Sequence, residues 1–273
     1  MTTTTEPGPR GLPDWLIPVP PSGFHALNPL TKLILATAVA VDAVIVGGVV
    51  VPLALLLVGV LLPAAWAGVV GRLLRLTLLL SLPIAVSSLL INVFFFPGGP
   101  DVLLRIGPVA ATREGVGFAV EVLVRILAIS GAIVLFYLAT RPSDLVVDLE
   151  RRGVSSRVGF VISSTVQVLP GMVDRATTIT AAQRARGLDT EGSVLRRARG
   201  VLPLVGPVVM GALGEVEERT LALEARGFTR PGRRTLLWSP TDTAPERLVR
   251  WLLVLSVPLA AVVRASGLLA GVA

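Results

Sequence analysis

Long apolar segments separated by short polar ones fill the first half of the chain. From Leu33 to Gly71 the only charged residue is Asp42. This stretch is long enough for two membrane-spanning helices of roughly 20 residues each. The residues from Gly47 to Pro52 predict the turn between them. An ionised Asp in mid-bilayer is costly, so Asp42 is expected either at the far interface, which its closeness to that turn favours, or facing protein.

A third span is predicted for residues 76–96, which carry no charge. A short polar link that holds Arg72 and Arg75 is expected to precede it. The next polar stretch, residues 97–114, contains two acidic and two basic residues and is expected to form a loop.

The fourth predicted span, residues 115–140, contains two charged residues of opposite sign. Glu121 and Arg125 are four residues apart on one helix face, so we expect them to pair with each other. A fifth apolar segment, residues 248–270, is also long enough to cross a bilayer and carries an Arg near each end, Arg250 and Arg264.

Residues 141–247 have a different composition, with 16 Arg and 12 Asp or Glu. Their apolar runs, 158–173 and 201–213, are short and interrupted by prolines. We expect these runs to form amphipathic helices that lie against the membrane domain rather than spans. The excess of Arg here and at Arg72 and Arg75 predicts that both regions, and the N-terminus, face the cytoplasm.

These patterns predict an all-α polytopic membrane protein with about five transmembrane helices and long cytoplasmic amphipathic helices. Residues 1–22, rich in Thr and Pro, are expected to be a disordered tail. The predicted domains are then a membrane domain of about four spans at 23–140, a cytoplasmic domain at 141–247, and a C-terminal transmembrane helix at 248–273. With five spans, the C-terminus falls outside.

Composition supports a membrane protein and excludes several kinds of site. The chain is 53% hydrophobic and only 16% charged, against roughly 25% charged in soluble domains. It has no Cys and a single His, His25, so no Cys metal site, no His cluster for zinc and no Ser-His-Asp triad are expected. No cofactor is predicted. The net charge of +7 is typical of cytoplasmic positive residues in a membrane protein, and no nucleic-acid partner is expected.

A short motif occurs twice in the polar region. Residues 182–188 and 222–228 both read Ala-x-x-Ala-Arg-Gly-apolar. Gly commonly follows the last residue of a helix, and a cation is favoured at that negative end of the helix dipole. The motif therefore indicates either two ordinary helix ends or two helix tips presented to a partner. We favour the second interpretation because two matched copies lie in the only long polar region.

The order of motifs resembles the T component, the EcfT-like transmembrane subunit of energy-coupling-factor (ECF) ABC transporters. The resemblance begins with Leu-Asn-Pro-Leu-Thr-Lys-Leu at residues 27–33, continues through several spans to Pro142-x-x-Leu145, and ends with the two Ala-Arg-Gly motifs. It covers roughly residues 23–270. Family members usually have Asp-Pro-Arg where this chain has Asn-Pro-Leu at 28–30, and a Thr where it has Arg141. Asn keeps the helix-capping chemistry, and Asn28-Pro29 is expected to open a helix because Pro fits the first helical position.

The resemblance implies a non-catalytic subunit of an importer in the bacterial plasma membrane. In that family two long coupling helices cross, and their Ala-Arg-Gly ends insert into grooves of two ABC ATPase subunits, of one kind or two. A separate membrane S component captures a vitamin or a metal ion. By this resemblance the ATPase-coupling residues are Ala185, Arg186, Gly187, Ala225, Arg226 and Gly227. The supporting residues are Gln183, Pro142, Asn28, Pro29 and Lys32.

The chemistry of the residues agrees with that implication. An Arg guanidinium is a planar, always-charged fork that can pair with a carboxylate through two hydrogen bonds, and small neighbours allow close approach. No Gly-x-x-x-x-Gly-Lys-Ser/Thr loop occurs in the chain, so we expect no ATP binding by the chain itself.

Two alternatives explain parts of the pattern. A conventional ABC importer permease carries one coupling loop of Glu-Ala-Ala-x-x-x-Gly followed by Leu-Pro. Residues 181–182 and 202–203 partly match it, but the Gly is displaced by one position, the downstream spacing is wrong, and a second tip has no explanation. Phosphatidyltransferases also use an Ala-Arg element, but they need paired Asp residues for a metal, and here Asp174 and Asp189 are far apart.

Overall fold

The computed structural model describes residues 22–95, 102–106, 109–187, 194–228, 230 and 240–266. The chain divides into two compact units, each described by itself. The first takes the chain up to Asp148 and from Ser239 onward, and the second runs from Leu149 to Trp238. Apart from Ser22, the tail predicted for residues 1–22 lies outside the described residues.

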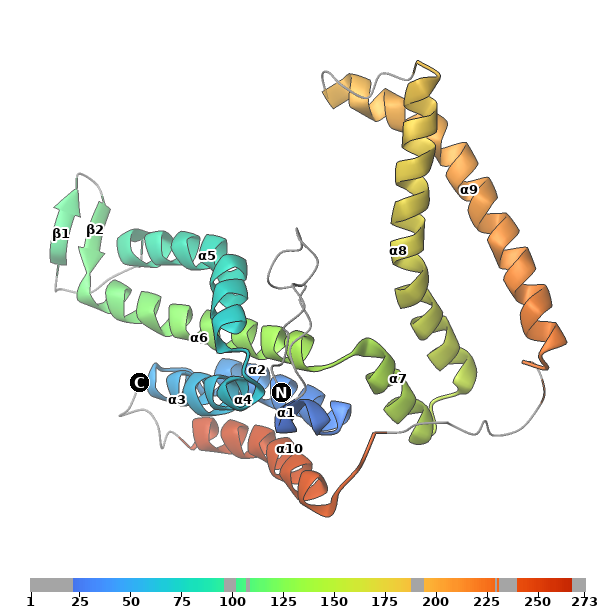
Figure 1. Ribbon diagram of the computed structural model, residues 1–273. Coiled ribbons are helices and arrows are strands. Elements are labelled where there is room, and N and C mark those ends of the chain that lie inside the picture. The colour runs from blue at the N-terminus through green and yellow to red at the C-terminus, as the bar shows by residue number, and fades with distance from the viewer. Residues whose placement is uncertain are drawn as a thin grey trace, which may run out of the picture. The chain divides into compact units, whose positions relative to one another are not determined.

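Helices make up most of the first unit (Figure 1). In chain order its elements are α1 (Gly23–Ala26), α2 (Pro29–Val46), α3 (Val50–Ala54), the π-helical stretch η2 (Leu55–Leu61), α4 (Leu62–Ala67), α5 (Val70–Phe95), strands β1 (Val102–Ile106) and β2 (Val109–Thr112), α6 (Arg113–Ala139), α7 (Pro142–Arg151) and α10 (Ala244–Ala265). The last residues of α7 already belong to the second unit, which contains α8 (Ser156–Ala185) and α9 (Val194–Ala225).

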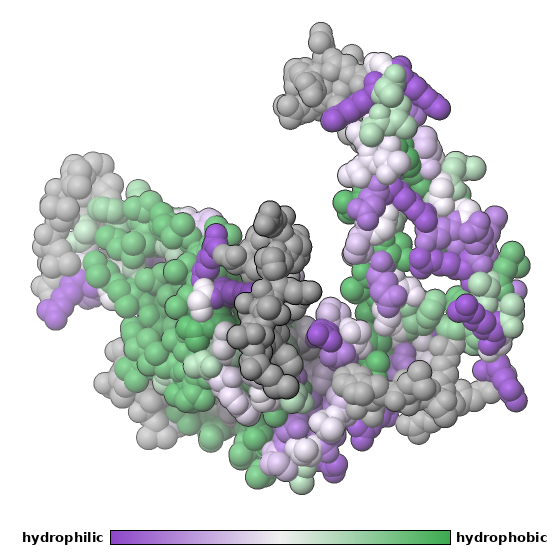
Figure 2. Space-filling view, viewed as in Figure 1, coloured by the Kyte–Doolittle hydropathy of each residue, from purple (hydrophilic) through white to green (hydrophobic). Residues whose placement is uncertain are grey.

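Among the described residues, five helical segments are long and apolar enough to cross a membrane, as the sequence predicted. They are Pro29–Val46, Val50–Ala67, Val70–Phe95, Arg113–Ala139 and Ala244–Ala265. The outer faces of α5 and α10 expose large apolar side chains such as Leu79, Ile84 and Trp251. Figure 2 shows this apolar surface over α5, whereas polar and apolar side chains mix over α8 and α9. Such a surface suits contact with lipid tails rather than with water.

The first two spans begin and turn where the sequence indicated. Asn28 caps α2 because its side-chain oxygen accepts a hydrogen bond from the backbone N–H of Leu30 at 3.0 Å. Pro29 occupies the first helical position, where a missing N–H leaves no bond unmade. After α2, Gly47 and Gly48 both have positive φ, +69° and +68°, which lets the chain reverse into α3.

Two sequence expectations in this unit were wrong. Arg72 and Arg75 do not lie on a polar link, because α5 already begins at Val70 and includes both residues. The stretch 97–114 is not all loop: β1 and β2 pair as an antiparallel hairpin, and α6 begins at Arg113. The apolar residues of this short hairpin alternate too weakly with polar ones to indicate strands.

The core of the first unit is an apolar cluster in which the helices pack closely. Its apolar cluster includes Val39, Val60, Leu73 and Leu135, each at most 4% exposed. Gly59 of η2 faces Val39 of α2 so closely that an added Cβ would lie 2.7 Å from a Val39 methyl carbon. Glycine is therefore a packing requirement at this position.

The second unit consists mainly of two long helices that cross (Figure 1). Helix α8 has 30 residues and α9 has 32, so each is about 45 Å long. Both continue through the prolines that interrupt their apolar runs, including Pro170 of α8. The helices are thus much longer than the apolar runs 158–173 and 201–213. Proline within a helix removes one hydrogen bond without always ending the helix, because the neighbouring turns can hold it.

The crossing point lies near Met172 of α8 and Ala212 of α9, which line a small cavity on one side and a larger open cleft on the other. The larger cleft has a volume of about 480 Å³. At the far end of the cleft the ring of Phe160, near the start of α8, packs edge-on against that of Phe228, just after α9, with centroids 4.7 Å apart. We call this pair the aromatic clasp. It shows that α8 and α9 run in opposite directions.

We expect Gly59→Ala to lower stability by about 1–3 kcal/mol, because the new methyl group overlaps Val39 in a packed core. Thermal unfolding of the purified protein in detergent measures the effect. Gly71→Ala is the matched control, since a Cβ there meets nothing within 4 Å. Equal melting temperatures for the two variants would contradict the packing requirement.

The aromatic clasp should appear as an energetic coupling. In a double-mutant cycle, Phe160→Ala and Phe228→Ala should be non-additive by about 0.5–1.5 kcal/mol, the range found for edge-to-face aromatic pairs. Denaturant unfolding of the wild type, both single variants and the double variant supplies the four free energies. Strict additivity would mean that the rings do not interact.

Candidate functional site

The first Ala-Arg-Gly motif forms the end of α8. Ala185 is the last helical residue, and the backbone N–H of Arg186 bonds to the carbonyl of Gln183 at 3.0 Å. Gly187 has φ of +93°, a conformation that favours glycine, and its N–H bonds to the carbonyl of Arg184 at 2.9 Å. The motif therefore ends the helix and turns the chain away.

The second motif ends α9 in the same way and adds one bond. Gly227 has φ of +71° and donates to the carbonyl of Glu224, while the N–H of Phe228 bonds to the carbonyl of Leu223, both at 2.9 Å. This pair of bonds is the Schellman arrangement of a helix end. Because Phe228 also belongs to the aromatic clasp, the second tip is attached to the start of α8.

Both motifs present their arginines to the surroundings. Arg186 and Arg226 are exposed, as are Ala185 and Ala225 beside them. Within the part of the chain that the structure describes, neither guanidinium has a hydrogen-bond or ion-pair partner. Both are therefore available to a carboxylate on another molecule, and the small alanines leave room for its surface to approach.

The two tips lie far apart, at opposite ends of the crossed pair. The second tip is held near Phe160, and Arg186 lies 26 residues further along α8. At the helical rise this separation is roughly 40 Å. The motifs thus form two separate sites rather than one composite site.

An ion pair between α8 and α9 joins the two helices between the tips. Glu215 of α9 forms ion pairs with Arg175 of α8 and with Arg219 one turn along its own helix, and its side chain is 20% exposed. Arg175 also lines the small cavity beside the crossing point. The sequence does not indicate this contact, since a pair between two helices has no fixed spacing along the chain.

Of the supporting residues, Gln183 lies in the last turn of α8 at the first tip, and the other four belong to the first unit. Pro142 is the first residue of α7 and is exposed, whereas Asn28, Pro29 and Lys32 are buried at the start of α2 in the first unit. These four residues therefore belong to the first unit, whereas both tips belong to the second.

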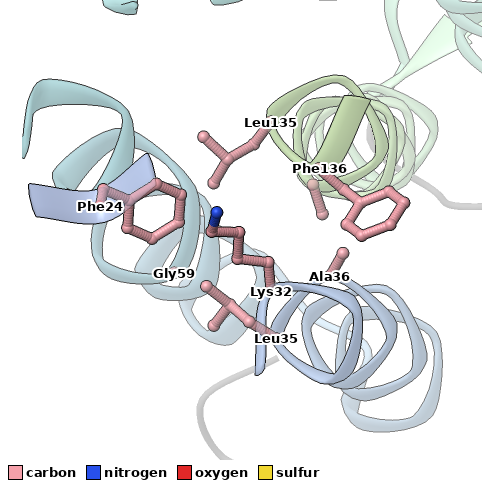
Figure 3. A pocket seen from close by; sticks show the side chains of 8 residues that line it. Phe24, Lys32, Leu35, Ala36, Gly59, Leu135 and Phe136 are labelled. Carbon is pink, nitrogen blue, oxygen red and sulfur yellow. The ribbon is translucent and has the colours of Figure 1, made fainter. Parts of the chain in front are cut away.

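Lys32, the only lysine in the chain, is 4% exposed. Its ammonium group donates to the backbone carbonyls of His25 and Ala139, each at 2.9 Å, and lies 5.7 Å from the centre of the Phe24 ring. Figure 3 shows the side chain reaching between Phe24, Gly59 and Leu135. Lys32 thus connects α1, α2 and the end of α6. Burial, together with the charge of Lys32, lowers the pKa of the His25 imidazole below its ordinary value.

A second buried cluster surrounds Asn28 and was not predicted. It contains Thr31, Asp148, Asp242, Glu246 and Arg250, and we call it the Asn28 cluster. Arg250 donates to Asp242 at 2.5 Å and to Thr31 at 3.2 Å. One part was visible in the sequence: Thr243-x-x-Glu246 is the capping pattern of a helix start, and the two side chains lie 2.9 Å apart.

Charged residues inside the predicted spans have partners in the protein. Glu121 and Arg125 pair along α6, which confirms the predicted structural pairing. Glu121 also accepts from the N–H of Gly48 at 2.8 Å. Asp42 is buried and accepts a hydrogen bond from Ser256 of α10 at 2.7 Å, so it faces protein, the alternative that the sequence analysis disfavoured.

Comparison with known proteins shows the family of the chain. Residues 22–236 match the sequence profile of the family described as cobalt transport protein (CbiQ). The energy-coupling factor transporter transmembrane protein EcfT of Limosilactobacillus fermentum is 31% identical over 233 residues, which cover 81% of this chain and 79% of the relative. The EcfT of Streptococcus equi is 30% identical over 61% of this chain and 66% of the relative. The EcfT of Thermosediminibacter oceani is 26% identical over 78% of this chain and 83% of the relative. The chain is therefore a multi-pass membrane protein of the CbiQ/EcfT family, the transmembrane components of energy-coupling-factor transporters.

Proposed function

We propose that this chain is the coupling subunit of an ECF-type importer. Two ABC ATPase subunits, identical or distinct, dock on the two Ala-Arg-Gly tips, and the crossed helices α8 and α9 transmit their ATP-driven motion to a membrane S component. The S component captures the substrate, a vitamin or a metal ion such as cobalt or nickel. The observation that carries the proposal is the pair of exposed arginines, Arg186 and Arg226, each at the end of a long helix.

The geometry of the tips suits two partners that move relative to each other. Because the tips are roughly 40 Å apart at opposite ends of two crossed helices, one compact domain is too small to hold both in one groove. A tip that inserts an Arg between small residues fits a groove lined by a carboxylate. Energy from ATP must come from these partners, since the chain has no phosphate-binding loop of its own.

In this proposal the chain lies in the bacterial cell membrane, with its N-terminus and residues 141–247 in the cytoplasm, where ATPases have access to the tips. The Arg excess of residues 141–247 supports this orientation. The substrate itself is not encoded here, because the S component that captures it is a different polypeptide.

The arginine tips should be essential, and they should act as a pair. Arg186→Ala or Arg226→Ala leaves a carboxylate of the ATPase buried without a partner, which costs on the order of 2–5 kcal/mol. Even the low end corresponds to a loss of roughly thirtyfold in affinity. Each single variant should weaken co-purification of the ATPases, and the double variant should abolish substrate uptake in cells.

Arg184→Ala is the matched control for these variants, because Arg184 is exposed two residues before Arg186 but has Glu224 as its counterpart in the second motif. It should assemble and transport nearly as the wild type does. If the arginines only cap helices, all variants should be equally mild, at a few tenths of a kcal/mol. Wild-type assembly and uptake by the Arg186→Ala, Arg226→Ala double variant would refute the proposed role of the tips.

The orientation can be tested by labelling single cysteines, since the chain has none of its own. Thr178→Cys, exposed on α8, should react with a membrane-impermeant maleimide only after the cells are opened. Glu114→Cys, exposed in the first turn of α6, should react in intact cells. The opposite pattern would reverse the proposed topology.

A further inference from the structure

Every polar group of Asn28 is hydrogen bonded, and three of these bonds reach distant parts of the first unit. Its side-chain oxygen caps α2 by accepting from Leu30 N–H, and its backbone N–H donates to Glu246 of α10 at 2.8 Å. Its side-chain amide donates two further hydrogen bonds, to the carboxylate of Asp148 at 3.0 Å and to the backbone carbonyl of Thr241 at 3.2 Å. Asn28 is fully buried, with 0% of its surface exposed.

The two acceptors of that amide lie at the two places where the chain passes between the units. Asp148 is the last residue of the first unit before the chain continues to α8. Thr241 lies two residues after Ser239, where the chain returns from α9. A single NH₂ group therefore holds both the outgoing and the returning segment against the start of α2.

The charges around Asn28 explain why an amide suits this position. Asp148 is 0% exposed and Glu246 is 8% exposed, and both place carboxylate oxygens within hydrogen-bond distance of Asn28. A neutral donor satisfies the buried Asp148 oxygen, whereas a carboxylate at position 28 would add a like charge. Arg250 completes the returning side by holding Asp242, the residue after Thr241.

We propose that Asn28 is a positioning residue for coupling: it fixes the two points at which the coupling unit, Leu149–Trp238, is attached to the membrane unit. The chain connects the coupling unit to the membrane unit at these two points. Motion that enters at the tips and travels along the chain therefore passes through them, and a loosely held connection transmits less of that motion. This inference rests on the proposed function for its role in transport. The double attachment itself consists of hydrogen bonds within this chain and needs no partner.

The attachment is tested first without any partner, by hydrogen exchange of the full chain in lipid nanodiscs. Asn28→Ser keeps an oxygen that can cap α2 but removes both amide donors. Exchange should accelerate about tenfold or more in two segments, α7 and residues 241–247, because each loses a hydrogen bond to Asn28 that resists local opening. Asn92→Ser is the matched control, since among the residues that the structure describes the Asn92 amide bonds only to Ser88, one turn away in α5. It should leave both segments unchanged.

Swapping the side chains at positions 28 and 148 tests the two attachments separately. Asn28→Asp alone should open both segments, by loss of donors and by repulsion from Asp148. Adding Asp148→Asn restores a donor and an acceptor between positions 28 and 148, so α7 should recover protection while residues 241–247 stay open. Wild-type protection of both segments in Asn28→Ser, or no recovery of α7 in the double variant, would overturn the inference.

The role in coupling is tested in the assembled transporter, as substrate taken up per ATP hydrolysed. In Asn28→Ser this ratio should fall about fivefold or more, with the ATPase subunits still bound. Changes of at least this factor are typical when the coupling between two linked sites is lost. Asn92→Ser should keep the wild-type ratio. An unchanged ratio in Asn28→Ser would refute the positioning role. If the wild-type chain binds no ATPase, the proposed function fails, while the exchange measurements still decide the attachment.

Discussion

Backbone carbonyls in the last turns of α2 and α6 bind cationic side chains, and the packing of the first unit depends on these bonds. The final carbonyls of a helix have no partner in their own helix and carry the negative end of its dipole. At the end of α2, Ala43 accepts from Arg125 and Ile45 accepts from Arg264. At the end of α6, Ala139 accepts from Lys32. Each bond joins two different helices, so α2, α6 and α10 are held together where an apolar environment would otherwise leave unpaired polar groups.

The features that the sequence predicted correctly are those determined by neighbours along the chain. A helix start such as Asn28-Pro29, a turn at Gly47-Gly48 and a pair such as Glu121 and Arg125 each depend on residues at most four positions apart. The ends of the two motifs are local in the same sense, because a glycine with positive φ follows each Arg. The five spans were predictable because length and hydropathy alone define them.

The features that were missed depend on contacts between distant residues. The partner of Asp42 is Ser256 and that of Asn28 is Asp148, and no spacing in the sequence indicates either pair. The prolines within α8 and α9 suggested interruptions, yet both helices continue, because a long helix tolerates one missing hydrogen bond. For the candidate site, the sequence predicted which arginines end the helices. It did not predict that Phe228 connects one of those ends to Phe160.

That aromatic contact makes the two tips mechanically unequal. A push on Arg226 passes through two residues and one ring contact to the first turns of α8, which is a short and stiff path. A push on Arg186 must travel along almost the whole of α8 before it reaches the same turns. The two Ala-Arg-Gly motifs are therefore connected to the start of α8 by paths of very different length. Under the proposed function, equal displacements of two partners would move the start of α8 by different amounts, so even identical partners would contribute differently to the movement.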